Sequence, residues 1–205
     1  MNIITISREF GSGGRELGKR LAEHLGYDYY DSEIIAAVAK QSGMDSDYIR
    51  TLGDGGWQQY PITFRSTLGS TMYTQSNKVQ LLLEQKKVIE GIAALGKSCV
   101  IVGRNADVLL KKYQPLNFFV CASAAGKLKR CTDRAPQGEQ LSERQLLRKM
   151  KSVDKARAQT RALLSPSPWG QRHEYHLTIN TTGWEIKEMV PSVAAYAEAW
   201  FRRGK

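Results

Sequence analysis

The chain has 205 residues, of which 41% are hydrophobic and 24% charged, which suits one domain with its own core. Its formal net charge of +10 favours an anionic partner, either a nucleotide or a nucleic acid, without choosing between them. No apolar run is long enough to span a membrane, and three cysteines without zinc-ligand spacing predict free thiols and a cytoplasmic protein.

The first 25 residues predict a strand, a glycine-rich turn and a helix. Residues 3–6 read Ile-Ile-Thr-Ile, a run typical of a buried strand. Three glycines fall within residues 11–14, and leucines then recur at four-residue spacing from Leu17 to Leu25, as in an amphipathic helix. Such a turn directs backbone N–H groups and the positive end of a helix dipole at one point. We therefore favour phosphate binding there over a plain turn.

The glycine-rich turn departs from the Walker A pattern. That pattern places Lys after its last Gly and then Ser or Thr. Here Gly13 is followed by Gly14, Arg15 and Glu16. The sequence thus predicts the phosphate cradle without its usual lysine and metal-binding hydroxyl, and the metal ligands stay unassigned.

Further along, strand and helix patterns alternate. An extended segment over 27–30 precedes Asp31, which is either a helix cap or a group that contacts a ligand. Apolar runs predict buried strands over 98–102 and 116–121 and a last strand over 175–180. Helices are predicted over 32–43, 79–95, 106–112, 124–134 and 142–164, and from residue 186, where Pro191 suggests a kink or a later start.

This alternation is typical of an α/β fold with a mainly parallel sheet. Ligands of such folds bind beyond the carboxyl ends of the strands, where residues 11–14, Asp31 and Arg104 are all expected. Residues 46–77 are aromatic-rich and weakly periodic, and their role as a substrate flap, an oligomer contact or an insertion stays open.

The helix over 142–164 carries charges on the side expected to face inward. Leu147 and Met150 mark an apolar stripe that Asp154, Arg157 and Arg161 continue at spacings of three and four. Charges there are costly unless they are paired or line a wet anion site. Because one acid cannot neutralise two arginines, we favour an anion site over an Asp154–Arg157 pair that satisfies itself.

Three motifs resemble the cytidylate-kinase-like family over nearly the whole chain. Residues 4–18 (ITISREFGSGGRELG) resemble the family's opening, and 102–105 (VGRN) its second motif. Residues 154–157 (DKAR), with 169–170 and 175–182, resemble its third. The resemblance implies a single domain of P-loop NTPase type, a three-layer αβα sandwich. The core would span 1–45 and 79–205, with an acceptor-binding insert at about 46–78 and a small helical lid at about 130–165.

The resemblance also implies ATP-dependent phosphoryl transfer with Mg²⁺ to a small phosphorylated acceptor, such as the nucleoside monophosphate CMP. It implies that the donor phosphates are held by Gly11, Ser12, Gly13, Gly14 and Arg15, with Arg130 and Arg134 from the lid. It gives the acceptor Asp31, Arg104, Asn105 and Asp154, and it gives catalytic roles to Arg15, Arg104, Arg157 and Arg161.

Three departures from true cytidylate kinases keep other interpretations open. Those enzymes resemble this chain but carry Lys at position 14, Thr at 16 and Asp at 105, and whether Arg15 replaces the lysine is undecided. A nucleotide-binding regulator without turnover is therefore the second hypothesis. A nucleic-acid-binding module ranks third, because no recognised motif for it is present. Trp57 and Trp200 leave a homodimer open.

Overall fold

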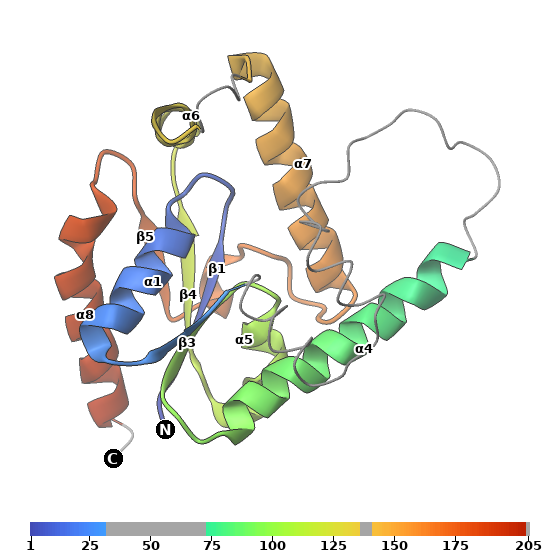
Figure 1. The fold of residues 1–205 in the computed structure, drawn as a ribbon, viewed down its shortest axis with the longest axis vertical. Coiled ribbons are helices and arrows are strands. Elements are labelled where there is room, and N and C mark those ends of the chain that lie inside the picture. The colour runs from blue at the N-terminus through green and yellow to red at the C-terminus, as the bar shows by residue number, and fades with distance from the viewer. Residues whose placement is uncertain (32–72, 136–140, 204–205) are drawn as a thin grey trace.

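A computed structural model describes residues 1–31, 73–135 and 141–203, with the side chains of 73–81 left out. Within these ranges five strands form an all-parallel sheet in the order β2-β3-β1-β4-β5 (Figure 1). The strands are β1 (Ile3–Arg8), β2 (Asp28–Tyr30), β3 (Cys99–Val102), β4 (Leu116–Cys121) and β5 (Leu177–Asn180). The predicted α/β class with a parallel sheet is confirmed, and β1 occupies the centre of the sheet.

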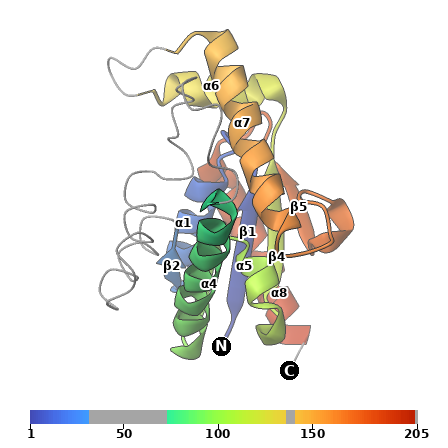
Figure 2. The same cartoon turned by 90° about the vertical axis from the view of Figure 1, so that its right-hand side faces the viewer.

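Helices cover both faces of the sheet, which confirms the three-layer αβα sandwich. One face packs against α1 (Gly14–Leu25) and α8 (Ile186–Arg203), and the other against α4 (Tyr73–Ala94) and α5 (Ala106–Leu109). Two more helices, α6 (Ala124–Asp133) and α7 (Glu143–Ala162), reach the edge where the strands end (Figure 1). Figure 2 views the sheet from the side that carries α4, α5 and α7. Short 3-10 turns lie at Lys111–Tyr113 and Arg172–Glu174.

The central strand shows why the sheet forms. Ile4 and Ile6 are fully buried against α1 and α8, and Ile3 is buried on the opposite face against α4. Strands buried on both faces need apolar residues at successive positions, which the β-branched run of β1 supplies. Each such side chain contributes about 1.5–3 kcal/mol of burial free energy. The parallel arrangement then brings the carboxyl ends of all five described strands to one edge.

Most helix boundaries agree with the predicted ones. The predicted capping box of α7 is present, because Ser142 accepts from the backbone of Gln145 and the Gln145 side chain accepts from Ser142. The α4 prediction was too short, since the helix begins at Tyr73 and its first turns lie in the segment assigned to the insert. Pro191 lies inside α8, which begins at Ile186, so the later start is wrong.

The helix predicted over 32–43 and most of the aromatic-rich segment lie outside the described residues. None of the described helices is both long and apolar enough to cross a bilayer.

Candidate functional site

The loop between β1 and α1 is built so that side chains are kept out of it. Gly11 and Gly13 have φ of +74° and +80°, a region that favours glycine. A Cβ on Gly13 would lie 2.5 Å from Ile186 Cδ1, and one on Gly14 would lie 2.6 Å from Arg8 Cβ. Gly13 is the N-cap of α1 and has no side chain to cap the first turn. The start of α1 is thus presented to a ligand as backbone, as anion binding requires.

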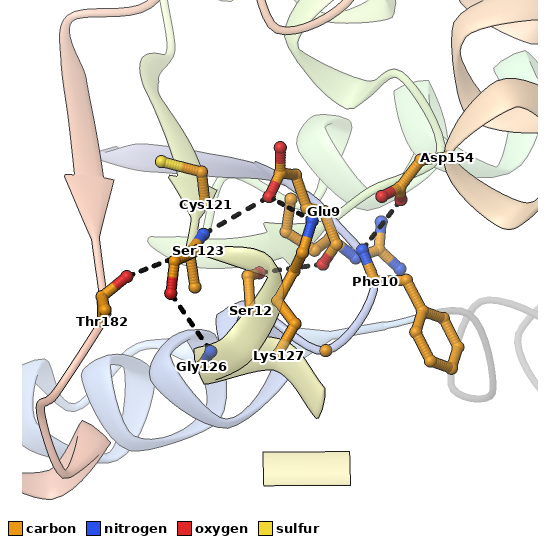
Figure 3. Close-up of polar contacts among 12 residues, drawn as sticks. Glu9, Phe10, Ser12, Cys121, Ser123, Gly126, Lys127, Asp154 and Thr182 are labelled. Atoms are coloured by element: carbon orange, nitrogen blue, oxygen red, sulfur yellow. Dashed lines mark hydrogen bonds and ion pairs between the residues drawn. The ribbon is translucent and has the colours of Figure 1, made fainter. Parts of the chain in front are cut away.

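Three carbonyl groups of the loop accept hydrogen bonds from protein side chains. Thr181 Oγ1 donates to the Ser12 carbonyl at 2.7 Å, and Arg130 Nη1 donates to the Gly11 carbonyl at 3.0 Å. The Ser12 hydroxyl is buried and donates to the Glu9 carbonyl at 2.8 Å (Figure 3). These bonds neutralise the negative ends of the peptide dipoles and so favour an anion at the opposite, N–H side.

Two acidic side chains join the loop to the helices beyond the sheet (Figure 3). Glu9 Oε2 accepts from Lys127 Nζ of α6 at 2.9 Å and from the Ala122 N–H at 3.3 Å. Asp154 Oδ1 of α7 accepts from the Phe10 N–H at 2.8 Å. Burial raises the pKa of Asp154, although the Phe10 N–H and Arg157 oppose that shift. The loop, α6 and α7 therefore form one hydrogen-bonded unit.

Arg157 brings a positive charge to the same place. Its Nη1 donates to Asp154 Oδ1 at 3.0 Å and to the Arg8 carbonyl at 2.9 Å, and its side chain is 18% exposed. Burial lowers the pKa of Arg157, while Asp154 opposes the shift. Burial, together with the charges of Arg157 and Arg104, also lowers the pKa of Arg8. Three guanidinium groups thus lie near one another at the carboxyl end of β1.

Arg15 and Asp31 pair at the neighbouring end of β2. Arg15 Nε lies 2.8 Å from Asp31 Oδ2, with the Arg15 side chain 57% exposed and the Asp31 side chain 3% exposed. The Tyr29 hydroxyl donates to the same carboxylate oxygen at 3.2 Å. Burial and the Asp31 charge raise the pKa of Tyr29 to about 12. The Arg15 side chain is thus directed toward the end of β2.

The backbone after β3 is strained. Gly103, Arg104 and Asn105 have φ of +81°, +58° and +51°, three successive left-handed residues of which two are not glycine. Such conformations cost energy and gather at functional sites. The Gln85 amide donates to the Arg104 carbonyl at 2.8 Å, and Asn105 is the N-cap of α5. The structure therefore places Arg104 and Asn105 at the same edge as the glycine loop.

Arg161 does not reach the loop. Its side chain is 3% exposed, forms an ion pair with Asp107 of α5 and donates from Nε to the Ser167 carbonyl at 3.0 Å. Although burial opposes the charge, Asp107 leaves the pKa of Arg161 raised. The Asp154–Arg157 pair, the alternative to the anion site, is present. The expectation that Arg157 and Arg161 have only one acid between them is wrong, because Asp107 of α5 pairs with Arg161.

Arg130 of α6 and Arg134 at its end, both predicted to lie in a lid, connect α6 to the rest of the domain. Arg130 Nη2 donates to the Thr181 carbonyl at 3.1 Å, in addition to its bond to Gly11. Arg134 forms an ion pair with Glu16 of α1, which also pairs with Arg20 at 2.8 Å. Partial burial opposes ionisation of Glu16, but the hydrogen bonds from the two arginines lower its pKa.

The sequence prediction missed several residues of this site. Lys127, Thr181 and Asp107 gave no local signal, because each pairs with a residue far away in the sequence. Arg8 did carry a signal. The Walker pattern has its first glycine five positions before its last. Counted back from Gly13, that position is Arg8.

The site fits the phosphates of a nucleotide better than it fits a metal held by the protein. The glycine cradle and the gathered arginines suit a triphosphate. Among the described residues, no group of three or more His, Cys, Asp or Glu could hold a metal ion. Glu9, Glu16, Asp31 and Asp154 are all already ion-paired. Mg²⁺ entering with ATP would be held chiefly by phosphate oxygens and water.

A parallel sheet with a glycine loop after its central strand, and with arginines beside that loop, defines a phosphate-binding α/β protein. The chain belongs to the cytidylate kinase-like family, which matches residues 3–183. Membership in a kinase-like family supports phosphoryl transfer as the class of chemistry. A comparison with curated proteins finds no match.

Solved structures agree on the fold. A structure titled as an uncharacterized protein from Eubacterium ventriosum ATCC 27560 is 25% identical, with a TM-score of 0.70, over 97% of this chain and 99% of that one. A shikimate kinase from Acinetobacter baumannii in complex with shikimate is 14% identical, with a TM-score of 0.52, over 97% and 94%. A shikimate kinase from Bacteroides thetaiotaomicron is 12% identical, with a TM-score of 0.56, over 96% and 98%.

Proposed function

We propose that this protein transfers the γ-phosphoryl group of ATP to a small phosphorylated acceptor, with a nucleoside monophosphate, first of all CMP, as the leading candidate. The observation that carries the proposal is the glycine loop itself. Its Gly11 and Ser12 carbonyls accept hydrogen bonds from Arg130 and Thr181. Arg8 of β1 lies against Gly14, and Arg157 of α7 contacts the Arg8 carbonyl, so positive charge lies beside the loop. Phosphoryl transfer needs chiefly this combination of positioning and charge.

The donor phosphates would lie on residues 11–15, against the first turn of α1. Arg157 is the side chain best placed to neutralise the transferring group, because it already contacts the carbonyl that precedes the loop. Asp154 would orient both Arg157 and the loop, through Arg157 Nη1 and the Phe10 N–H. Arg130 and Arg134 would keep α6 closed over the donor side by their bonds to the Gly11 carbonyl and Glu16.

The acceptor would lie on the side of β2 and β3. Arg15 and Asp31 stand at the end of β2, and Arg104 and Asn105 at the end of β3. An exposed arginine next to a buried carboxylate can exchange part of its ion pair for a phosphate group. The positive φ at Arg104 and Asn105 would orient the acceptor-side backbone. We assign Arg161 a positioning role through α5 in place of the predicted catalytic one, because it is buried against Asp107.

The deciding experiment measures ADP release from ATP and Mg²⁺ against a panel of nucleoside monophosphates. Shikimate is included because two similar structures are kinases for it. We expect turnover with one nucleoside monophosphate and its loss in Arg157→Ala. Turnover with shikimate alone would contradict the proposed nucleoside monophosphate acceptor and would still support phosphoryl transfer from ATP.

A nucleotide-binding regulator without turnover is the second candidate, and one observation favours it. Glu16 stands where related cytidylate kinases carry a hydroxyl, and its carboxylate is engaged by Arg20 and Arg134. ATP binding without ADP release for any acceptor would support this candidate and contradict the kinase proposal.

A further inference from the structure

The loop contains one basic residue that the predicted roles leave unused. In the Walker pattern glycine opens the loop and lysine follows its last glycine. In this chain arginine opens the loop, as Arg8, and glycine takes the lysine position, as Gly14. The glycine and the basic residue have exchanged places.

The structure shows that these two positions face each other. A Cβ built on Gly14 would lie 2.6 Å from Arg8 Cβ and 3.1 Å from Arg8 Cγ. The Arg8 side chain therefore begins in the space where a side chain at position 14 would begin. Only one of the two positions can carry a long side chain, which explains why Gly14 accompanies Arg8.

The far end of Arg8 lies on the backbone after β3. A Cβ on Gly103 would overlap the Arg8 guanidinium, so the glycine there leaves room for it. Burial and the charges of Arg157 and Arg104 lower the pKa of this guanidinium, and the carboxylate of Asp31 opposes the shift. Within the described residues, the structure gives the Arg8 side chain no hydrogen bond and no ion pair. The half-buried guanidinium of Arg8 thus has no directly bonded acceptor among the described residues, and a bound anion would supply one.

We infer that Arg8 supplies the positive charge that the Walker pattern takes from its lysine, and that it binds the phosphate chain of a nucleotide. The inference rests on the proposed function and deepens it. Arginine can make this substitution because its planar fork binds phosphate with two hydrogen bonds. Arg15, the residue first considered for this role, is paired with Asp31 at the end of β2.

The test measures binding of inorganic tripolyphosphate and of ATP to the full chain by titration calorimetry. Arg8→Met keeps an unbranched stem that fills the first part of the same space and removes the charged end. We expect its Kd for tripolyphosphate to rise by about 10-fold to 150-fold, the range for a charge-assisted hydrogen bond. Lys19→Ala is the matched control, because it removes an exposed charge from α1 and should leave the Kd within about twofold.

A double variant separates this role from a structural one. Arg8→Gly with Gly14→Lys restores the Walker order and removes the atoms that would meet a side chain at position 14. Of the three atoms nearest to a Cβ at position 14, Val120 Cβ, at 3.2 Å, then remains and would have to shift by a few tenths of an ångström. We expect this variant to bind tripolyphosphate within about fivefold of the parent chain, whereas Gly14→Lys alone should lose binding or unfold.

Three results would overturn the inference. Arg8→Met could bind as tightly as the parent chain, the folded double variant could fail to recover binding, or the double variant could fail to fold, as judged by circular dichroism. If Arg8→Met itself does not fold, the double variant alone decides. If tripolyphosphate binding depends on Arg8 but no acceptor is phosphorylated, the proposed function is wrong and the inference about Arg8 stands. If Arg8→Met still transfers the phosphoryl group and binds tripolyphosphate as the parent chain does, the inference is wrong and the proposed function stands.

Discussion

Two arginines on α7, one turn apart, lie in opposite surroundings. Arg157 is 18% exposed and shares its acid, Asp154, with the Phe10 N–H of the glycine loop. Arg161 is 3% exposed and has an acid of its own, Asp107, on α5. Arg161 pairs with an acid that has no second role at the loop, so its charge stabilises the fold. The acid that pairs with Arg157 also binds the glycine loop, so the charge of Arg157 lies where a ligand of that loop would bind.

The largest expected effect on stability in this contrast between Arg157 and Arg161 comes from replacing Arg161. Arg161→Ala leaves Asp107 buried and unpaired, and should lower the free energy of unfolding by about 3–5 kcal/mol, measured by urea denaturation. Arg161→Met combined with Asp107→Leu removes both charges and should cost much less. A loss under about 1 kcal/mol in Arg161→Ala would contradict the fold-holding role.

Arg157 should show the opposite balance. Arg157→Ala is expected to lower kcat by about 10²-fold to 10³-fold with the acceptor found in the panel, because a charge aimed at the transferring group is lost. Its stability should fall less than that of Arg161→Ala, by about 1–3 kcal/mol, since Asp154 keeps the Phe10 N–H as a donor. Unchanged kcat together with a large stability loss would place Arg157 in the same class as Arg161.

The loop can also be loosened without touching an arginine. Thr181 is fully buried, and its hydroxyl donates to the Ser12 carbonyl at 2.7 Å. Thr181→Val leaves that carbonyl without its donor, so we expect about 1–3 kcal/mol less stability and severalfold weaker tripolyphosphate binding. Thr178→Val, at an exposed position of β5, is the control and should change neither. Equal effects of the two variants would show that the Thr181 bond does not position the loop.

The sequence allowed most of the fold to be predicted, because its signals are local. β-branched runs marked β1 and β3, and the Ser142–Gln145 capping box marked the start of α7. The start of α4 was misplaced because its first turns, from Tyr73, are polar and weakly periodic.

The site was predicted less completely, since its pairs are distant in sequence. Asp107 lies in a four-residue helix too short to show periodicity, and its partner Arg161 is 54 residues away. Without that acid, Arg157 and Arg161 looked equivalent on the helix. Arg8 is the last residue of β1. The alternation of side chains along a strand shows which face Arg8 is on, but it does not show that its side chain contacts Gly14 and Gly103.

The smallest expected effect concerns His176, which lies away from both Arg157 and Arg161. It sets the pH dependence of stability that is expected without any contribution from the arginines. His176 Nδ1 accepts the Asn117 N–H at 2.9 Å, so this imidazole is neutral in the fold, and burial lowers its pKa below 6.5. The unfolded chain then binds more protons than the folded chain as the pH falls through that value. The contribution of His176 to stability is therefore present above about pH 6.5 and lost below it.

Because His176 is only partly buried, we expect Tm to fall by only about 1–2 °C between pH 7.5 and 5.5 on its account. His176→Asn offers an oxygen to the same N–H but does not titrate, so its Tm should change less over that range. Arg157→Ala should keep the slope of the parent chain, because it leaves the β4–β5 edge intact. A slope that vanished in Arg157→Ala and survived in His176→Asn would move the pH-sensitive group to the loop, where burial already raises the pKa of Asp154. The glycine loop would then contribute to the stability of the fold. That result would contradict the contrast drawn above, in which Arg161 stabilises the fold and Arg157 serves the ligand site.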